Sequence, residues 1–532
     1  MGCGASAASQ GTDHVGNPCT AEADATEPPE SSKVGMPAPR SVLTLNLVVT
    51  EVLPADPGQQ DALVRRCMRR AQFKHFFVSG DAFESVYLCG ETIGEGGFGT
   101  VKKATHKALG IPRAVKCLQK SEVNDELIRN ELEALMALDH PHIVKLVEYF
   151  NQGDKLYLVF ELCEGPSLLD VIRKSPEGRL SNYDAAKSLR HMLKALQCCH
   201  AQHRGHYDVK PENFMFSSPD LSNLVMIDLG LSGGFDVHRR RNNKIRGSES
   251  YMAPEFWDGV YGPEGDIWGL GVVLFTMLTG QNFLPNVPRA TTRHEAAARQ
   301  FIRGRLDYAA ETYGLSETAV DLMGAMLQHD RHGRPTLREA LNHAFNRDSY
   351  DRDRDASHDS AAFQEAQRLR ERLPGIFRAV AFEPRLKRLA RLVMAHIGPV
   401  CVAERWVFRF LDKHGCGELS LSTLEYSFQR RNVPIPNDLE SLFQAIDMNQ
   451  SGYIGFWQFL AATLPYRLRN DKDLCEAAFH ALDANDDGIL DAADLEAVLG
   501  HEKDSEACCS ALAEVSETGR MTVVTFQEFM AG

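Results

Sequence analysis

A series of short motifs follows a fixed order between Gly94 and Arg334, and this order constrains the fold more than any other feature of the chain. Glycines come first, after a strand-like run. A lysine then lies inside an apolar strand, and polar loops and long helical patterns follow. Because strands precede helices, this region is predicted to be an α+β domain with two lobes, spanning residues 86–345.

The first half of this region carries phosphate-binding features. The glycine-rich motif IGEGGFGTV supplies Gly94, Gly96, Gly99 and Val101. Such glycines let two strands and their turn lie close over a triphosphate, with backbone N–H groups facing its oxygens. Lys116 lies within the apolar RAVKCL, where an ammonium is costly to bury unless it meets a phosphate and a carboxylate. Glu131 supplies the carboxylate, because it lies on the inward face of the helical run ELIRNELEALMAL.

The second half carries acid and amide side chains at a characteristic spacing. GHYDVKPENFMF contains Asp208, Lys210 and Asn213, and MIDLGLS then presents Asp228. The motifs APE at 253–255, DIWGLG from 266 and RHGRPT around 334 complete the order. Over residues 86–345 the chain therefore resembles a protein kinase.

The resemblance implies a role for each of these residues. Asp208, Lys210, Lys116 and Glu131 form the expected catalytic set. The expected ATP contacts are Gly94, Gly96, Gly99, Val101, Ala114, Lys116, Glu161 and Cys163. Asn213 and Asp228 are expected to hold Mg²⁺, which prefers oxygen ligands.

Several residues depart from the kinase pattern. Tyr207 stands where most kinases have the arginine that clamps an activation-loop phosphate, and the only hydroxyl residue between 228 and 247 is Ser232. Activation by phosphorylation of that segment is therefore not expected. Ser167 replaces a glutamate that many related kinases use for ribose or for a basic substrate residue. Leu229 is expected to act as an apolar plug, and Phe160 to close the pocket behind adenine.

Beyond residue 360 the chain is predicted to be all-α and repetitive. Loops rich in Asp, Asn and Gly begin at 412, 447 and 483, which are 35 and 36 residues apart. The third loop, DANDDGILDAAD, has the ligand spacing of an EF-hand. Its predicted Ca²⁺ ligands are Asp483, Asn485, Asp487, the carbonyl of Ile489, and Asp494. Asp494 is one methylene shorter than the usual glutamate, so a lowered affinity is expected.

The other loops are degenerate. The second offers Asp447, Asn449, Ser451 and Tyr453. Its last position is Gln458, which cannot supply a charged bidentate ligand, so weak Ca²⁺ binding and none are both open. The first begins with Asp412 but has His, Cys and Thr at ligand positions, which predicts an empty, structural hand. A last segment, ETGRMTVVTFQE, is expected to pair with the third hand through a short strand.

A basic amphipathic helix is predicted between the two modules. In PRLKRLARLVMAHI, apolar residues recur at helical spacing and basic residues flank them, which suits an EF-hand groove; a helix packed inside its own domain is the alternative. A kinase, a junction helix and four hand-like units in this order resemble the calcium-dependent protein kinases of plants and apicomplexan parasites. We therefore expect a linker and autoregulatory junction at 346–400 and a calmodulin-like EF-hand domain at 401–532.

The amino-terminal 85 residues are expected to be a disordered extension. MGCGAS fits the pattern for myristoylation of Gly2, with Cys3 available for palmitoylation; an unmodified disordered start is the alternative. A basic helix is predicted at 63–77. It either packs on its neighbour or contacts lipid or the autoregulatory region.

Composition limits the class of protein further. The net charge of −14 argues against general nucleic-acid binding. The 13 cysteines contain no CxxC pair, which indicates a reducing, cytoplasmic setting, and no apolar run is long enough to span a membrane.

The sequence thus predicts a calcium-regulated serine/threonine kinase that uses Mg²⁺ and ATP to phosphorylate protein hydroxyls at the cytoplasmic face of a membrane. The alternative is a calcium-responsive membrane scaffold whose kinase fold is weakly active or inactive. Substrates, the membrane concerned and the oligomeric state cannot be read from the sequence.

Overall fold

The structure is a computed structural model, which describes residues 82–347 and 361–531 apart from 97–98, 122–124, 230–232, 235–246, 285–293, 413, 431–432, 500–508 and 510. Several predictions lie outside the described residues. They concern the acylation motif at Gly2 and Cys3, the basic helix at 63–77, Ser232 and most of the linker at 346–360.

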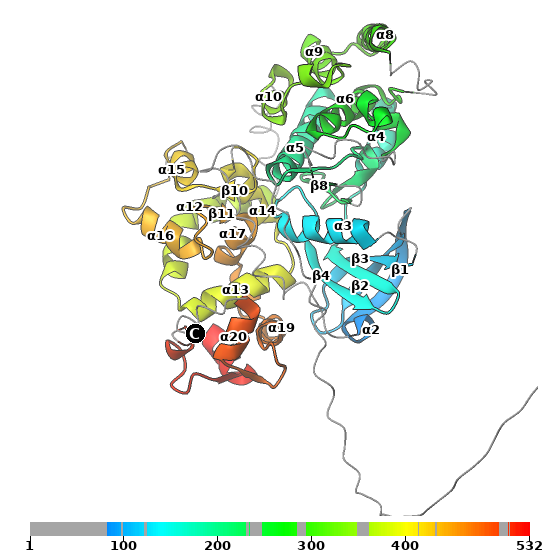
Figure 1. Cartoon of the computed structure of the whole chain (residues 1–532). Helices are drawn as coiled ribbons and strands as arrows, with labels where there is room; N and C mark the ends of the chain where they lie inside the picture. The colour runs from blue at the N-terminus through cyan, green and yellow to red at the C-terminus, as the bar shows by residue number, and fades with distance from the viewer. Residues whose placement is uncertain are drawn as a thin grey trace, which may run out of the picture. The chain divides into compact units, whose positions relative to one another are not determined.

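The first lobe is an antiparallel sheet with a single long helix (Figure 1). After the short helix α2 (Phe83–Val86), the strands are β1 (Tyr87–Gly96), β2 (Gly99–His106), β3 (Pro112–Gln119), β4 (Leu146–Gln152) and β5 (Lys155–Glu161), in the order β1-β2-β3-β5-β4. The helix α3 (Asp125–Ala137) follows β3. Tight connections join β1 to β2 and β4 to β5, as expected for antiparallel neighbours.

The second lobe is mainly helical. Its helices are α4 (Leu168–Lys174), α5 (Asn182–Ala201), α6 (Pro263–Thr279), α8 (Glu295–Tyr313), α9 (Glu317–Met326) and α10 (Leu337–Leu341). Two pairs of short strands flank the loops that carry Asp208 and Asp228. They are β6 (Arg204–Gly205) with β9 (Gly233–Gly234), and β7 (Phe214–Phe216) with β8 (Leu224–Met226). Every residue of α6 from Gly265 to Thr279 is buried, so this helix forms the centre of the lobe.

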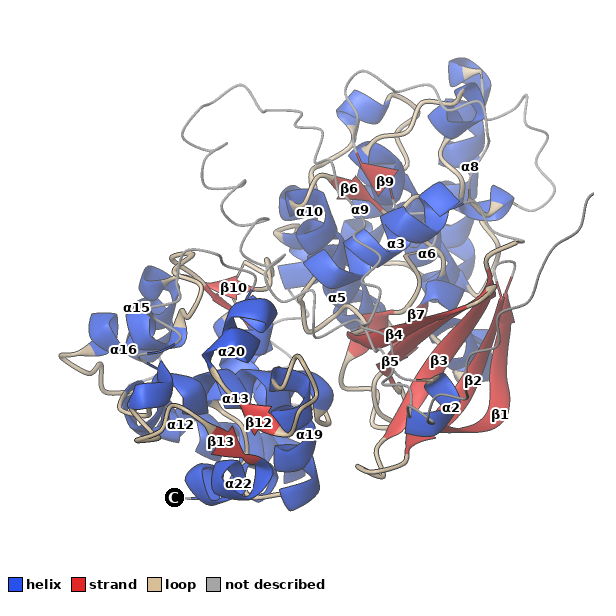
Figure 2. Cartoon of the chain, turned by 60° about the horizontal axis from the view of Figure 1, so that its bottom comes forward, coloured by secondary structure: helices blue, strands red, loops and turns tan. Residues whose placement is uncertain are grey.

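The carboxy-terminal region is helical, and very short strands in the loops between its helices pair with one another (Figure 2). Its helices are α12 (Ala361–Ala381), α13 (Arg385–Ile397), α14 (Val402–Leu411), α15 (Leu421–Gln429), α16 (Leu439–Ile446), α17 (Phe456–Ala462), α18 (Tyr466–Arg469), α19 (Lys472–Leu482), α20 (Ala492–Leu499) and α22 (Val523–Ala531). Strand β10 (Glu418–Leu419) pairs with β11 (Ile454–Gly455), and β12 (Ile489–Leu490) with β13 (Met521–Thr522). The second pairing confirms the predicted strand between the third hand and the last segment.

The junction helix α13 packs onto hand helices. It contacts α17 and α19, and its apolar residues Leu386, Leu389 and Val393 are buried in the core of this region. On its basic flank, Lys387 Nζ donates to Phe529 O at 3.1 Å and Arg388 Nη1 to Ala445 O at 2.6 Å. The predicted amphipathic helix therefore packs into the hand region with its apolar face and with the basic residues of its first turns.

The helix α12 is a feature that the sequence did not single out. Its 21 residues lie at the start of the stretch predicted to be helical, ahead of the junction helix, and it contacts α14 and α16. None of the described helices has the length and apolar composition needed to cross a membrane.

Candidate active site

Lys116 connects the two halves of the predicted catalytic set. Its Nζ lies 2.6 Å from Glu131 Oε1 on α3 and 3.3 Å from Asp228 Oδ1, so one ammonium contacts both carboxylates. Burial alone would lower the pKa of Lys116, but the two carboxylates outweigh it and the pKa is raised. The lysine is therefore a fixed positive charge beside Asp228.

Glu131 responds to the same surroundings. Burial raises its pKa, and the charge of Asp228 adds to that effect, while Lys116 opposes it. Lys116 is the group that favours the ionised form of this carboxylate. The ion pair thus holds α3 close to β3, in the arrangement that phosphoryl transfer by kinases requires.

Asp208 lies at the centre of a network of hydrogen bonds. Lys210 Nζ donates to its Oδ2 at 2.6 Å, Ser248 N to its Oδ1 at 2.8 Å, and Asn213 Nδ2 to its backbone O at 2.8 Å and its Oδ2 at 3.1 Å. Although burial opposes it, Lys210 and Ser248 lower the pKa of Asp208. The carboxylate is therefore ionised and held in one orientation, as a hydrogen-bond acceptor for a hydroxyl needs to be.

Ser248 was missed by the sequence analysis. Besides its N–H contact with Asp208, its Oγ accepts a hydrogen bond from Lys210 Nζ at 2.9 Å. It bridges the catalytic loop to the segment that leads into the APE motif. Its position five residues before that motif was the available signal.

Asn213 and Asp228 form a donor set that fits Mg²⁺. Ile227 N donates to Asn213 O at 3.0 Å, so the backbone next to Asp228 is tied to Asn213. The amide nitrogen of Asn213 donates to Asp208, which leaves its oxygen as the atom it offers to a cation. One carboxylate and one amide oxygen are hard ligands of the kind that Mg²⁺ prefers when phosphates complete its shell.

The glycine-rich motif forms the hairpin between β1 and β2. Gly96 pairs with Gly99, and Gly94 with Val101. Gly99 has φ +145°, and a Cβ there would lie 2.1 Å from Cys117 O. Only glycine fits this position, because both the backbone conformation and the adjacent strand exclude a side chain.

The residues predicted to contact adenine lie on β3, on β5 and just beyond it. Ala114 pairs with the buried Phe160, and Glu161 ends β5. Cys163 is half-buried, and burial raises the pKa of its thiol to about 12. The two oxygens of the Glu161 carboxylate are already engaged by the protein: Oε1 accepts from Lys145 N at 3.0 Å, and Oε2 accepts from Arg405 Nη2 at 2.6 Å.

Tyr207 and Gly205 form a matched pair. Tyr207 has φ +66° and is buried, and its ring stands edge-on to Phe256 and Tyr261 at centroid distances of 5.8 and 5.3 Å. A Cβ on Gly205 would lie 2.3 Å from the Tyr207 ring, so the glycine makes room for the tyrosine. Aromatic packing thus ties the catalytic loop to the segment after the APE motif.

Two further residues keep the catalytic loop in place. Asp266 accepts from His206 N at 2.9 Å and from Tyr207 N at 2.7 Å. Arg334 makes two contacts with Glu255, at 2.6 and 2.8 Å. These residues belong to the later motifs of the ordered series, and they act on the architecture of the site rather than on a substrate.

Ser167 has a structural role. It is the N-cap of α4, where its Oγ accepts from Asp170 N at 3.1 Å and donates to Asp170 Oδ2 at 2.6 Å. Leu229 is buried in the core, as expected for an apolar plug.

The third hand gathers oxygen ligands around one loop. Asp483 accepts from Gly488 N at 2.9 Å, Asn485 from Asp487 N at 2.9 Å, and Asp487 from Ile489 N at 2.8 Å. These contacts fold the loop around Asp483, and the predicted ligand set of three carboxylates, one amide and one backbone carbonyl is of the oxygen type that Ca²⁺ prefers.

Asp494, the last ligand of this hand, is buried and close to the other acids. Its Oδ2 accepts from Asp491 N at 2.9 Å, and burial raises its pKa. A carboxylate that is costly to ionise in the empty loop gains most from a bound cation.

The second hand differs at its last position. Gln458 Oε1 accepts from Gly455 N at 2.8 Å, while its Nε2 donates to Asn449 Oδ1 at 3.1 Å. The Gln458 amide therefore hydrogen-bonds to the Asn449 oxygen, which is itself a predicted Ca²⁺ ligand, and adds no charged ligand of its own. This contact gives a physical reason for the weak Ca²⁺ binding predicted for Asp447, Asn449, Ser451 and Tyr453.

Comparison with known proteins agrees with both modules. The model of the protein kinase domain matches residues 87–346, and the EF hand model matches 439–456 and 476–499. Calcium-dependent protein kinase 7 of Arabidopsis thaliana is 30% identical over 458 residues, covering 84% of this chain and 82% of its own. The chain belongs to the calcium-dependent protein kinases.

Other members of the family show similar relationships. Calcium-dependent protein kinase 9 of Oryza sativa subsp. japonica is 30% identical, covering 84% of this chain and 76% of its own. Calcium-dependent protein kinase 5 of Plasmodium berghei (strain Anka) is 28% identical, with 80% and 74% covered. Among solved structures, the twitchin kinase region from C. elegans matches with a TM-score of 0.45 and 26% identity, over 51% of this chain and 47% of that one.

Family membership settles the class of reaction. The chain is a calcium-regulated serine/threonine protein kinase, as the sequence predicted, and nothing favours the inactive scaffold. A kinase domain implies protein substrates and the use of ATP with Mg²⁺, and EF-hands imply Ca²⁺.

Proposed function

We propose that this kinase transfers the γ-phosphoryl group of ATP with Asp208 as the acceptor of the substrate hydroxyl proton and Lys116, Lys210, Asn213 and Asp228 as the charged and ligand groups around it. The observation that supports this most is the double contact of Lys116 with Glu131 and Asp228, at 2.6 and 3.3 Å. It aligns a helix of the first lobe with the metal-binding carboxylate, and active kinases need both in place at once.

The chain's own groups divide the work. Asp208, held by Ser248 N and Asn213, accepts the proton from the substrate hydroxyl. Lys210 is the nearest positive charge to that carboxylate and offsets charge on the group in transfer. Mg²⁺, bound by Asn213 and Asp228, would neutralise charge on the β- and γ-phosphates.

Tyr207 has no cationic group with which to bind a phosphate, which supports activity without phosphorylation of the segment after Asp228. We expect phosphatase-treated enzyme to transfer radiolabelled phosphate from ATP to a mixed protein substrate within about twofold of the untreated rate, in Ca²⁺ and in EGTA alike, because Tyr207 cannot pair with a phosphate. A large loss of rate that returns after preincubation with ATP would contradict this. No incorporation at any Ca²⁺ level, with ATP still bound, would contradict the catalytic assignment itself.

We further propose that the third hand is the main Ca²⁺ site and that the junction helix α13 is the element through which it acts. Its burial among α17 and α19, and the contact of Lys387 with Phe529 in the last helix, support this. A ligand shifts such an equilibrium only by its different affinities for the two states, so one sound site limits the available coupling. The substrate preference stays open, because Ser167 caps a helix instead of presenting a carboxylate.

At the membrane, we propose myristoylation of Gly2 and palmitoylation of Cys3 on the cytoplasmic face. We expect Gly2→Ala to move most of the protein from the membrane pellet to the supernatant, and Cys3→Ser to do so partly. One myristoyl chain alone binds only marginally, with an association constant of about 10⁴ M⁻¹. Fractionation of cells expressing tagged protein measures this. Retention of both variants would transfer the role to the basic stretch at 63–77.

A further inference from the structure

The first EF-hand loop lies against the kinase domain, and two glycines allow the approach. A Cβ on Gly415 would lie 2.4 Å from Lys194 Cγ of α5. A Cβ on Gly417 would lie 2.7 Å from Asp139 O, ahead of β4. Lys194 Nζ also donates to Asp412 O at 3.3 Å. The loop that lacks cation ligands thus has its tip, at positions four to six, against the kinase domain, whereas the second loop reaches Asp139 only from its last turn, through Trp457 N at 2.8 Å.

The second and third loops provide an internal comparison at the same positions. At loop position six, Gly452 and Gly488 have nothing within 4 Å of a Cβ, whereas Gly417 faces Asp139. Their left-handed backbone explains the glycine in all three loops, but only in the first loop does the kinase domain cover this position.

Loop position four is more informative. Gly415 has φ +67°, and Gln450 and Asp486 have φ +50° and +59° at the equivalent positions. Residues with side chains therefore adopt this backbone in the other two loops, and both side chains are exposed. A glycine at 415 is not required by the backbone, so the closeness of Lys194 is the remaining reason for it.

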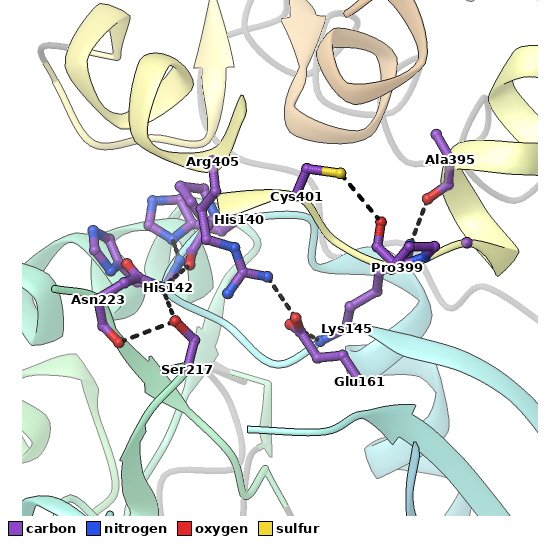
Figure 3. Close-up of polar contacts among 12 residues, drawn as sticks. His140, His142, Lys145, Glu161, Ser217, Asn223, Ala395, Pro399, Cys401 and Arg405 are labelled. Atoms are coloured by element: carbon purple, nitrogen blue, oxygen red, sulfur yellow. Dashed lines mark hydrogen bonds and ion pairs between the residues drawn. The ribbon is translucent and has the colours of Figure 1, made fainter. Parts of the chain in front are cut away.

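The helix leading into this loop continues the contact. From α14, Arg405 reaches Glu161 at 2.6 Å in an ion pair with both side chains buried (Figure 3). One turn later, Arg409 Nη1 donates to Ser222 O at 3.1 Å and its Nη2 lies 2.6 Å from His191 Nε2. Helix and loop together contact the end of β5, the segment before β8, and α5.

We infer that α14 and the first loop form a docking surface for the kinase domain that does not depend on Ca²⁺. The surface is Arg405, Arg409, Asp412, Gly415 and Gly417, and its partner is the face around Lys194, Asp139 and Glu161. The contacts use arginine, lysine, backbone and glycine, and none uses a metal ion. The loop has exchanged ion binding for this contact, since a cation loop must stay accessible to its ligand.

The regulatory consequence rests on the proposed function. If the third hand is the Ca²⁺ site, this surface keeps the first half of the EF-hand region attached to the kinase while the second half responds to the ion. The docking itself can be measured without any kinase assay.

Lys194 is a direct reporter of docking, because its amine is covered by the loop. We expect acetylation of the full-length protein by N-hydroxysuccinimide acetate, read by mass spectrometry, to modify Lys194 about tenfold more slowly than the exposed Lys174, equally in EGTA and in Ca²⁺. Gly415→Gln installs the residue that the second loop has at this position and should raise the Lys194 rate to about that of Lys174. The matched control Gln450→Ala, at the same position of the open second loop, should leave it slow.

Two results would overturn the inference. One is a Lys194 rate that rises to that of Lys174 when Ca²⁺ is removed from the wild-type protein. The other is a Lys194 that stays protected in Gly415→Gln. A second variant, Arg409→Glu, breaks the surface from α14 and should expose Lys194 with an unchanged circular dichroism spectrum, which guards against misfolding of the first. If the wild-type protein showed no Ca²⁺-stimulated phosphotransfer while Lys194 stayed protected, the proposed role of the third hand would be contradicted and the docking inference would stand.

Discussion

Replacing Asp208 with asparagine should lower phosphotransfer by about 10²–10⁴-fold, the range that a positioned general base contributes. Asparagine is nearly isosteric and can still accept from Ser248 N, which donates to Asp208 Oδ1 at 2.8 Å. The variant therefore removes the charge that accepts a proton and little of the packing. Initial rates with radiolabelled ATP and saturating Ca²⁺ measure the loss.

The controls separate chemistry from folding. Binding of a fluorescent ATP analogue should change less than about threefold, because Lys116 and its two carboxylates are untouched. Asp184→Asn is the matched substitution: Asp184 is exposed in the first turn of α5, and its rate should remain near that of the wild type. A tenth or more of wild-type activity in Asp208→Asn would remove Asp208 from the role of base.

The second large effect is expected at the third hand. With one sound Ca²⁺ site, the coupling is about 1–3 kcal/mol, which corresponds to activation of about 5- to 150-fold. We expect a Hill coefficient near one, and Asp483→Ala should reduce the stimulation to less than about twofold, since Asp483 is the first ligand and accepts from Gly488 N. Rates across buffered free Ca²⁺ concentrations measure both quantities.

A second substitution shows whether coordination is the cause. Asp486→Asn lowers the charge of the same loop at position four, which supplies no ligand in the EF-hand pattern and where the side chain is exposed, and should preserve the stimulation. Asp483→Asn keeps an acceptor for Gly488 N but loses charge, and should resemble the alanine variant. Steep, cooperative activation that survives both changes at Asp483 would show that the degenerate hands bind Ca²⁺ strongly.

Much of the site could be predicted because its chemistry is encoded locally. Lys116 in an apolar strand, Glu131 on the inner face of a helix, and Asp208 with Asn213 each need a particular residue at a particular spacing, and the structure brings them together. The third hand is similar, since all its ligands come from one short loop.

The remaining features depend on contacts that leave no periodic signal. Gly205 makes room for Tyr207, but only the folded backbone shows that a Cβ there would meet the ring. The Arg405–Glu161 pair joins residues 244 positions apart. The first hand was predicted to be merely structural, because ligand loss is visible in the sequence and the surface that replaces the ligand is not.

The contact of Arg405 with Glu161 makes the hand region part of the support of the predicted nucleotide site. The end of β5, which is expected to contact ATP, has the Glu161 carboxylate bound by Arg405 of α14, and nearby Lys145 Nζ donates to Ala395 O at 2.6 Å (Figure 3). Arg113 likewise donates to Ile397 O. A chain that ends at residue 347 would expose Glu161, Lys145 and Arg113 to water. It would also leave Glu161 without Arg405, its cationic partner. Inhibitors selected against such a shortened kinase would meet a differently supported end of β5. Screening on the full-length protein is therefore the sounder route to compounds that distinguish it from kinases without a hand region.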